Sequence, residues 1–218
     1  MEEEAKYPAE PIPEKEISRA IIKRLPRYYR YLGELMDDGV EHISSSNLAR
    51  IMGLTASQIR QDMNVFGSFG QQGYGYNVRN LYHEIAKILH IGRVHKIVVV
   101  GAGNLGKALG GYANFRNRGF EIVAFFDSDE TKIGTEIAGK PVYPMDMLPD
   151  YIDDNKIEIA ALTLPKEGAR VVCDMIKETY LKGILNFAHT DLKVPKHITV
   201  ENVHITDNIM RLCYNMHE

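Results

Sequence analysis

The stretch "KIVVVGAGNLGKALGGY", residues 96–112, decides the fold of the second half of this chain. It joins a short β-branched strand to a helical pattern through Gly101, Gly103 and Gly106. In such a turn the first glycine allows a tight bend, the second lets a pyrophosphate approach the backbone, and the third lets helix and strand pack closely. The start of the helix adds unpaired N–H groups and partial positive charge, which favour phosphate. The stretch therefore predicts a dinucleotide-binding turn.

An acidic residue follows the next strand at the distance that this kind of turn requires. The run "EIVAFFD" ends at Asp127, about 20 residues after the last glycine. Its carboxylate could accept hydrogen bonds from the ribose hydroxyls of adenosine and repel a 2′-phosphate, which favours NAD(H) over NADP(H). A glycine-rich turn without a ligand and an acid with only a surface role are the alternatives.

The residues after His95 alternate between strand and helix patterns. Short β-branched runs, "HKIVVVG", "FEIVAFFD", "IEIAALTLP" and "GILNFA", are separated by helical patterns such as "KEGARVVCDMIKETYL". This alternation predicts a doubly wound parallel sheet. The last segment, "TDNIMRLCYNMHE", predicts an amphipathic helix capped by Thr206, which needs an apolar surface to cover.

The first third of the chain predicts helices followed by a hairpin. "AIIKRLPRYYRYLGELMDDG" has helical spacing, with Pro26 near its first turn or at a kink. "SSSNLARIMG" predicts a short helix with a serine cap that ends at Gly53, and Thr55 caps the next helix, "LTASQIRQDMNVF". The glycine-rich run "GSFGQQGYGYNV" suits a β-hairpin, and "VRNLYHEIAKILHIG" predicts a further helix that bridges two domains. Together these patterns predict a helix-turn-helix with a wing.

The third of these helices has two different faces. Ile59, Met63 and Phe66 fall on one side and belong to a core. The opposite side carries Ser57, Arg60, Gln61 and Asn64. Arg reads guanine, and Asn or Gln reads adenine, in the major groove of DNA. A solvated face is the alternative, but such faces usually carry Glu and Lys, which this one lacks.

Charge and cysteine content narrow the class of protein further. The chain of 218 residues has a formal net charge of −3, yet residues 14–94 carry 11 Lys and Arg against 8 Asp and Glu. Such a layout is typical of a nucleic-acid module inside an acidic protein. Cys173 and Cys213 lack the spacing of a metal site, which predicts a reduced, cytoplasmic chain without a metal. No apolar run approaches the roughly 20 residues of a membrane span.

These motifs, in this order, resemble the family of redox-sensing transcriptional repressors called Rex. "ISSSNLARIMGLTASQIRQDMNVFGSFGQQGYGYNV" is similar to its winged helix, and "VVVGAGNLGKAL", "AFFDSD", "LTLP", "GILNFA" and "VENV" are similar to its Rossmann domain. The similarity runs over nearly the whole chain after the acidic tail. It implies a homodimer that represses transcription on palindromic double-stranded operator DNA, senses the NADH/NAD⁺ ratio, and releases DNA when NADH binds.

The resemblance also implies domain limits and residue roles. Tyr112 would lie near the nicotinamide, and Arg30 and His204 would belong to the switch between the domains. The expected domains are a mobile tail (1–13), a winged-helix DNA-binding domain (14–83), a linker helix (84–94), a Rossmann NAD(H)-binding domain (95–205) and a C-terminal helix exchanged between subunits (206–218). The expected cofactor-binding residues are Gly101, Ala102, Gly103, Asn104, Leu105, Gly106, Asp127, Tyr112, Thr163, Pro165 and Asn186. The expected DNA-binding residues are Ser57, Gln58, Arg60, Gln61, Asn64, Gly73, Tyr74 and Arg50.

Two positions depart from the family pattern. Family wings often carry Lys or Arg where this chain has "GQQGYGY", so phosphate contacts from Gln71 and Gln72 should be weaker. The position after "VENV" often holds an acid that pairs across the dimer, and here it is His204. That histidine could make the switch sensitive to pH, or it could be an ordinary hydrogen-bonded residue.

An NAD-dependent oxidoreductase with an appended helical domain is the rival interpretation. Such an enzyme needs a substrate domain and an acid or base near the nicotinamide. None of the eight histidines lies in a recognisable catalytic motif, although His189 follows the end of a strand, where ligands bind. Once about 80 residues form the DNA-binding domain, too little chain remains for a substrate domain, so a regulator is expected rather than an enzyme.

Overall fold

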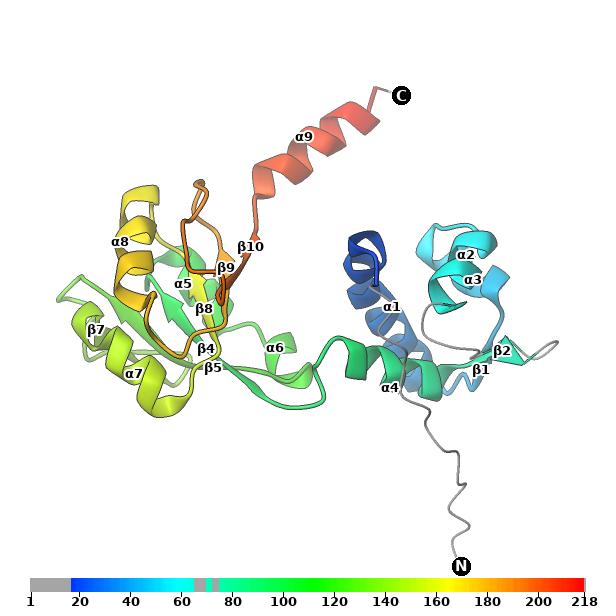
Figure 1. Cartoon of the computed structure of the whole chain (residues 1–218), viewed down its shortest axis with the longest axis horizontal. Helices are drawn as coiled ribbons and strands as arrows, with labels where there is room; N and C mark the ends of the chain where they lie inside the picture. The colour runs from blue at the N-terminus through cyan, green and yellow to red at the C-terminus, as the bar shows by residue number, and fades with distance from the viewer. Residues whose placement is uncertain (1–16, 65–69, 72–74, 218) are drawn as a thin grey trace, which may run out of the picture. The chain divides into compact units, whose positions relative to one another are not determined.

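The structure is a computed structural model, and the chain divides into two compact units, Met1–Gly92 and Arg93–Glu218. Figure 1 shows the elements of the two units. Each unit buries its own set of apolar side chains. The residues that the structure describes are 17–64, 70–71 and 75–217. Of the expected sites, Phe66, Gln72, Gly73 and Tyr74 lie outside these residues.

The first unit combines helices with a small antiparallel sheet in the order β1-β3-β2. Tyr76 of the central strand pairs with Ile43 on one side and Gly70 on the other. The pairing of β2 with β3 confirms the predicted hairpin after the helix-turn-helix. The elements are α1 (Arg19–Asp37), β1 (His42–Ile43), α2 (Ser45–Met52), α3 (Ala56–Asn64), β2 (Gly70–Gln71), β3 (Gly75–Asn77) and α4 (Val78–Ile88).

Three local signals set the boundaries of α2 and α3. The Ser44 hydroxyl accepts a hydrogen bond from the Asn47 N–H at 3.1 Å and caps the start of α2. Gly53 ends α2 with a φ of 63°, in the left-handed region that glycine favours. The Thr55 hydroxyl accepts from the Gln58 N–H at 3.1 Å and caps α3. The predicted helix-turn-helix is therefore confirmed together with its caps.

Helices α1 and α4 pack together and supply much of the first core. Pro26 lies well inside α1 rather than in its first turn, because the helix begins at Arg19, after the cap Ser18. Helix α4 begins at Val78 and buries its apolar face in this core. Helix α4 therefore spans the expected boundary between the DNA-binding domain (14–83) and the linker helix (84–94), and these domain limits stay a prediction.

The second unit is built on a sheet of seven strands in the order β10-β9-β8-β4-β5-β7-β6. Neighbouring strands are parallel except for β6 and β7. From β4 the chain moves first toward β5 and β7 and then back toward β8, β9 and β10, which confirms the doubly wound sheet. The elements are β4 (His95–Val100), α5 (Asn104–Gly110), α6 (Asn114–Asn117), β5 (Phe120–Asp127), β6 (Glu136–Ile137), β7 (Lys140–Pro144), the 3-10 helix η1 (Met145–Met147), α7 (Leu148–Asn155), β8 (Ile159–Leu162), α8 (Lys166–Ile176), β9 (Gly183–Asn186), β10 (Thr199–Asn202) and α9 (Ile205–Asn215).

The two faces of this sheet are covered unequally. On one face α7 and α8 bury side chains such as Ile152 and Val172 against the strands. On the other face α5 and α6 contribute Leu109 and Phe115, and an apolar groove of about 320 Å³ remains. The groove is lined by Ile97, Phe120, Ile122, Ile159, Ala161 and Leu185, among others.

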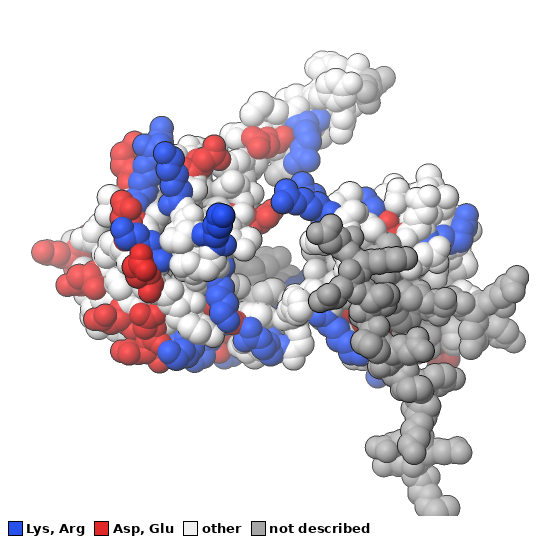
Figure 2. Space-filling model, viewed as in Figure 1, with Lys and Arg blue, Asp and Glu red and all other residues white. Residues whose placement is uncertain are grey.

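The C-terminal helix α9 extends from β10 away from the sheet (Figure 1), and none of its residues is buried. It begins directly after His204, so the expectation that Thr206 caps it is wrong: Thr206 lies in its first turn. The side chains of Ile205, Ile209 and Leu212 are 57%, 53% and 58% exposed. In Figure 2 the helix appears mostly white, that is, uncharged.

Candidate functional site

The glycine loop lies between β4 and α5, where the strand order reverses and doubly wound folds bind ligands. Gly101 has a φ of 106°, and a Cβ there would come within 2.9 Å of the Thr163 carbonyl oxygen. A Cβ on Gly106 would collide with the carbonyl oxygen of Gly101. A Cβ on Gly103 would meet no atom within 4 Å. Packing within the chain thus accounts for the first and third glycines, whereas Gly103 faces open space that a ligand could fill.

Asp127, at the end of β5, is tied to this loop. Its Oδ2 accepts hydrogen bonds from the Ala102 N–H at 2.7 Å and Lys132 Nζ at 3.2 Å, and its Oδ1 accepts from the Asp129 N–H at 2.9 Å. Burial raises the pKa of Asp127, but these hydrogen bonds outweigh it and leave the pKa below its usual value. A carboxylate has about four acceptor positions, so one remains for a ribose hydroxyl.

The other expected cofactor residues fall into two groups. Asn104 and Leu105 are exposed at the start of α5, and Pro165 precedes α8. Thr163 instead binds the loop itself, since its hydroxyl donates to the Gly101 carbonyl oxygen at 2.7 Å. The structure places all four residues near the carboxyl ends of β4 and β8.

Asn186, at the end of β9, is fully buried. Its Nδ2 donates to the Thr190 carbonyl oxygen at 2.9 Å and to Asn202 Oδ1 at 2.8 Å, and its Oδ1 accepts from the Ala188 N–H at 3.0 Å. These bonds hold the loop after β9 against β10. The side chain therefore orders the loop beside the expected site, and its contact with a cofactor stays a prediction.

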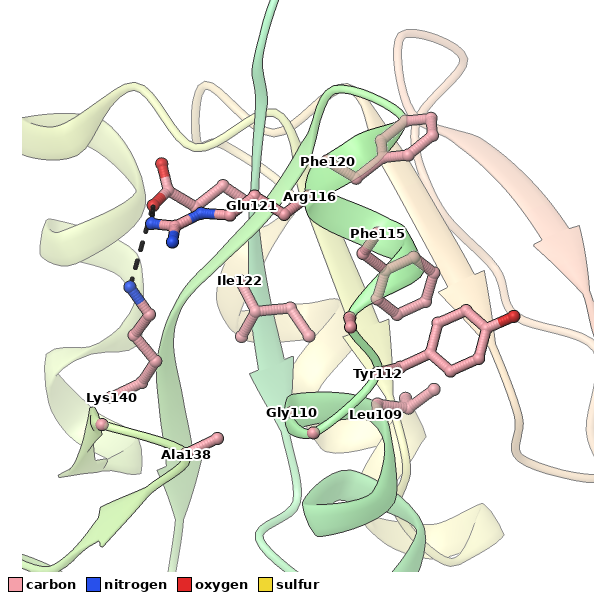
Figure 3. Close-up of a pocket in the computed structure, with 13 residues that line it drawn as sticks. Leu109, Gly110, Tyr112, Phe115, Arg116, Phe120, Glu121, Ile122, Ala138 and Lys140 are labelled. Atoms are coloured by element: carbon pink, nitrogen blue, oxygen red, sulfur yellow. Dashed lines mark hydrogen bonds and ion pairs between the residues drawn. The ribbon is translucent and has the colours of Figure 1, made fainter. Parts of the chain in front are cut away.

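Tyr112 lies beyond the far end of α5, about 10 Å along the helix from the glycine loop at 1.5 Å per residue. Its ring packs edge-on against Phe115, as Figure 3 shows, and the two ring centroids lie 5.1 Å apart. Both rings border a pocket of about 290 Å³. Across this pocket, Glu121 pairs with Arg116 at 3.3 Å and Lys140 at 3.7 Å. The contact of Tyr112 with a nicotinamide also stays a prediction.

Two histidines meet where β9 and β10 end. The rings of His189 and His204 are stacked, with centroids 5.5 Å apart and planes at 16°. Among the buried side-chain nitrogen and oxygen atoms of the described residues, His204 Nδ1 is the one without a hydrogen-bond partner. His204 therefore makes no hydrogen bond at Nδ1 in this structure, and its role in the switch stays a prediction.

The first unit presents the polar face predicted on α3. The residues of the predicted DNA-binding face are all exposed: Ser57, Arg60, Gln61 and Asn64. On the opposite side of α3, Ile59 and Met63 are buried in the core. The Arg60 guanidinium touches the Ser45 hydroxyl at 3.3 Å. A bond of this length at the surface is easily given up for a base or a phosphate.

Two further cations of the first unit are exposed, Arg50 on α2 and Arg30 on α1. Arg50, on α2, is exposed and makes a long bond to Asn47 Oδ1 at 3.4 Å. Arg30, on α1, is exposed with its guanidinium carbon 5.0 Å from the ring centre of Tyr31. Both are therefore accessible cations, as a phosphate or switch contact would require.

Gln58 is a predicted DNA-binding residue whose side chain is hydrogen-bonded to a buried acid of the same helix. Its Nε2 donates to Asp62 Oδ1 at 2.9 Å. Asp62 is only 1% exposed, and it also accepts from Arg24 through Nε and Nη2, both at 2.7 Å, and from the Tyr28 hydroxyl at 2.8 Å. This network fastens α3 to α1.

Asp62 and Lys132 are the functional candidates that sequence reasoning missed. Each had a weak signal: Asp62 is an acid beside the apolar Met63, and Lys132 follows Asp127 by five positions. The signal at Asp62 does not identify its partner, because Arg24 lies 38 residues away and is brought to it only by packing. The partner of Lys132 is near in the sequence, and their pairing depends on the turn after β5.

Metal and membrane functions receive no support from the described residues. No group of three or more His, Cys, Asp and Glu side chains in this part of the chain could hold a metal ion. No described helix has both the length and the apolar character needed to cross a membrane. Cys173 and Cys213 are both free thiols.

A helix-turn-helix with a wing, followed by a dinucleotide-type sheet, defines a class of protein: a transcription regulator with a ligand-binding domain. Residues 16–64 match a family described as "Putative DNA-binding protein N-terminus", and residues 93–190 match one described as "CoA binding domain". Proteins named redox-sensing transcriptional repressor Rex from Clostridioides difficile and Clostridium beijerinckii are 52% and 46% identical over 94% of this chain and 97% of their own. This chain belongs to the Rex family of redox-sensing transcriptional repressors.

Solved structures of the family agree with the fold. The crystal structure of RSP in complex with β-NAD⁺ and operator DNA matches with a TM-score of 0.87 at 44% identity, covering 92% of each chain. The structure of RSP in complex with β-NADH matches with a TM-score of 0.85 at 40% identity, covering 93% of this chain and 95% of that one. The sequence-based resemblance is thereby confirmed at the level of the family.

Proposed function

We propose that this chain is a regulator, working in the cytoplasm, that represses transcription as a homodimer on palindromic operator DNA and releases that DNA when NADH binds. The observation that carries the proposal is the pairing, in one chain, of an exposed Ser-Arg-Gln-Asn face on α3 with the glycine loop beside Asp127. The RSP complexes, one with β-NAD⁺ and operator DNA and one with β-NADH, support both halves of the proposal.

On the DNA side, α3 would enter the major groove. Its exposed residues Ser57, Arg60, Gln61 and Asn64 would face base edges, with Arg50 on a phosphate and the wing residues Gly73 and Tyr74 near the backbone. A dimer presents two such helices related by a twofold axis, which matches a palindromic site.

On the cofactor side, NAD(H) fits better than a nucleotide with a phosphate on its adenosine ribose. Asp127 keeps its negative charge and one acceptor position free beside the open space at Gly103. Ribose hydroxyls would use that position, whereas the ribose phosphate of NADP(H) or of coenzyme A would meet like charge. Lys132, 3.2 Å from Asp127, weakens this repulsion without cancelling it.

The homodimer would use α9. This helix exposes Ile205, Ile209 and Leu212, while the sheet leaves an apolar groove along Ile97, Ile159 and Leu185. An exposed apolar helix face and an open apolar groove are complementary surfaces, and their burial would stabilise an association at about 25 cal/mol per Å². Exchange of α9 between subunits would bring it against the partner's domains.

The switch would be a shift between two arrangements of the dimer. NADH can release DNA only if it binds the DNA-incompetent arrangement more tightly. NAD⁺ differs from NADH by one positive charge on the nicotinamide, and an apolar cover over that ring disfavours the cation. We propose that Ile205 and Ile209 of the partner subunit form the cover, and that Arg30 and His204 relay the change.

A mobility-shift selection tests the proposal directly. Purified protein is mixed with a palindromic duplex library, with no nucleotide, with NAD⁺ or with NADH. We expect a symmetric site to be enriched and its complex to be lost with NADH but not with NAD⁺. Binding that is absent at modest ionic strength, or equal under all three conditions, contradicts the proposal.

A further inference from the structure

The inference rests on the proposed function, and it concerns how one residue of α3 is aimed. Gln58 lies in the first turn of α3, and the first residues of a recognition helix are those that reach base edges. Its amide is also the fourth hydrogen-bond donor to the buried Asp62, beside Arg24 and Tyr28. One side of this amide is therefore committed to the interior of the protein.

The chemistry of Asp62 decides which side that is. Burial raises the pKa of Asp62, but the hydrogen bonds from Arg24, Tyr28 and Gln58 outweigh it and leave the pKa below its usual value. An ionised carboxylate only accepts hydrogen bonds. The Gln58 amide must therefore turn its nitrogen inward, because the reverse orientation would set two acceptor oxygens against each other.

The carbonyl oxygen of Gln58 consequently faces outward. The hydrogen bond from the Gln58 side chain uses Nε2 and leaves Oε1 unused. Oε1 is not buried either, since His204 Nδ1 is the one buried side-chain atom without a partner in the described part of the chain. Gln58 thus offers an acceptor, held in a fixed direction, at the start of the DNA-facing helix.

We propose that the Gln58 carbonyl oxygen, aimed outward by Asp62, accepts a hydrogen bond from the exocyclic amino group of adenine or cytosine in the operator. In the major groove these two bases present an amino donor, at N6 and N4, whereas guanine and thymine present carbonyl acceptors there. The second N–H of the Gln58 amide can add a hydrogen bond to adenine N7. Because the amide nitrogen faces inward, a contact with only the carbonyl group of guanine or thymine is not favoured. Asp62 is then a positioning residue for specificity.

Gln61 provides the matched comparison on the same helix. It is exposed, and among the described residues no hydrogen bond fixes its amide. Its oxygen and nitrogen can exchange places at little cost, so either end can meet a base. The contribution of Gln61 to DNA binding should therefore not change when the Asp62 carboxylate is lost.

The test is a double-mutant cycle between the protein and single atoms of DNA. Selection from a random duplex library by the wild type and by Gln58→Ala first identifies the base pair whose preference the variant loses. At that pair, purine in place of adenine or 2-pyrimidinone in place of cytosine removes the amino group. 2-Aminopurine in place of guanine or 5-methyl-2-pyrimidinone in place of thymine removes the carbonyl. Effects on base pairing are common to both proteins and cancel in the comparison.

We expect removal of the amino group to weaken wild-type binding about fivefold or more relative to Gln58→Ala, the lower end of what one good base contact contributes. Removal of the carbonyl should affect both proteins equally. In Asp62→Asn the new amide can donate as well as accept, so it no longer fixes the orientation of Gln58. This variant should reduce the coupling between Gln58 and the amino group of the base, and it should leave the corresponding cycle with Gln61→Ala unchanged. A melting curve and an NADH titration check that this variant is folded; if it is not, the Gln58→Ala cycle alone decides.

Two results overturn the inference while operator binding stands. One is coupling of Gln58 to the carbonyl instead of the amino group. The other is an equal loss on every sequence in Gln58→Ala, which would assign the residue to a phosphate. Failure of the wild type to select any duplex is a different result, because it would remove the proposed function as well.

Discussion

At the scale of single residues, Asp127 sets the choice of dinucleotide. Asp127→Ala should weaken NADH binding roughly 10- to 100-fold, as expected for the loss of a hydrogen bond to a charged group. The same change frees Lys132, which now lies 3.2 Å from the carboxylate, to attract a 2′-phosphate. The difference in affinity between NADH and NADPH should therefore become smaller, as measured by calorimetric titration of both nucleotides.

The role of Lys132 in this prediction has its own control. In the double variant Asp127→Ala, Lys132→Ala the gain in NADPH affinity should disappear, because the cation beside position 127 is removed as well. An unchanged NADH affinity in Asp127→Ala would mean that the ribose binds elsewhere.

Glu158 is a buried acid of the second unit that is paired with three basic side chains. It is 6% exposed and pairs with Arg93 at 2.6 Å, His95 at 2.8 Å and Lys182 at 3.2 Å. The hydrogen bond from Arg93, together with those from His95 and Lys182, lowers the pKa of Glu158 to about 2 in spite of burial. Because the folded-state pKa is depressed, this stabilisation is complete above the ordinary pKa of 4.5 and is lost as pH falls toward 2.

Glu158→Gln should accordingly lower the free energy of unfolding by about 1–3 kcal/mol at pH 7. The difference from wild type should shrink between about pH 4.5 and 2, as measured by denaturant titration at several pH values. Asp154→Asn, an exposed acid on α7, is the control and should change little at any pH. A deficit in Glu158→Gln that is constant with pH would show that charge is not its cause.

Single residues also mark where prediction from sequence ends. The glycines, Asp127 and the polar face of α3 could be identified because spacing along the chain carries their signal. The roles of Asp62 and the His189–His204 stack could not, since each depends on a partner brought close by tertiary packing. The pairing of Lys132 with Asp127 depends on the conformation of the turn between them. Gln58 was expected at DNA, and its bond to Asp62 joins residues four apart on α3. The bonds from Arg24 and Tyr28 that surround Asp62 in the core appear only once α1 and α3 are packed.

At the scale of elements, α3 should read sequence through Arg60. Arg60→Ala should cost about 1–3 kcal/mol on the preferred operator and relax the choice of one base, as measured by fluorescence anisotropy on a set of single-substituted duplexes. Arg79→Ala, an exposed cation on α4, controls for the general loss of positive charge. An equal loss on every duplex would assign Arg60 to a phosphate.

Helix α9 should determine the preference for the reduced cofactor. Ile209→Asp places a negative charge in the proposed apolar cover, which should favour the nicotinamide cation and reduce the preference for NADH over NAD⁺. Asn208→Asp adds the same charge at the neighbouring position, where the residue already accepts a hydrogen bond from Arg211 at 2.6 Å, and should leave the preference intact. Titration of both nucleotides measures the effect, and an unchanged preference in Ile209→Asp would remove the idea of an apolar cover.

Element boundaries were predictable where a cap or a stop is local. Ser44, Gly53 and Thr55 set α2 and α3 as expected. The start of α1 lies one residue before the predicted stretch, which begins at Ala20; the Ser18 cap sets this start, and Ile21 packs against the core. Strands β6, β7 and β10 escaped the pattern because they lie at or near the sheet edges, where burial no longer imposes a long apolar run.

At the scale of the whole molecule, the proposed switch requires coupling between the binding of NADH and the binding of operator DNA. If NADH weakens operator binding by some factor, operator must weaken NADH binding by the same factor. A swing from mostly bound to mostly released needs several kcal/mol of differential binding. Neither unit can supply this coupling alone, because one carries the DNA face and the other the glycine loop.

The most direct test is the affinity of the protein for NADH measured by calorimetry with and without saturating operator duplex, and with NAD⁺ as the comparison. The account predicts that operator weakens NADH binding at least tenfold, about 1.4 kcal/mol of coupling, and weakens NAD⁺ binding far less. Equal NADH affinity in the two conditions, with the operator bound throughout, would contradict it.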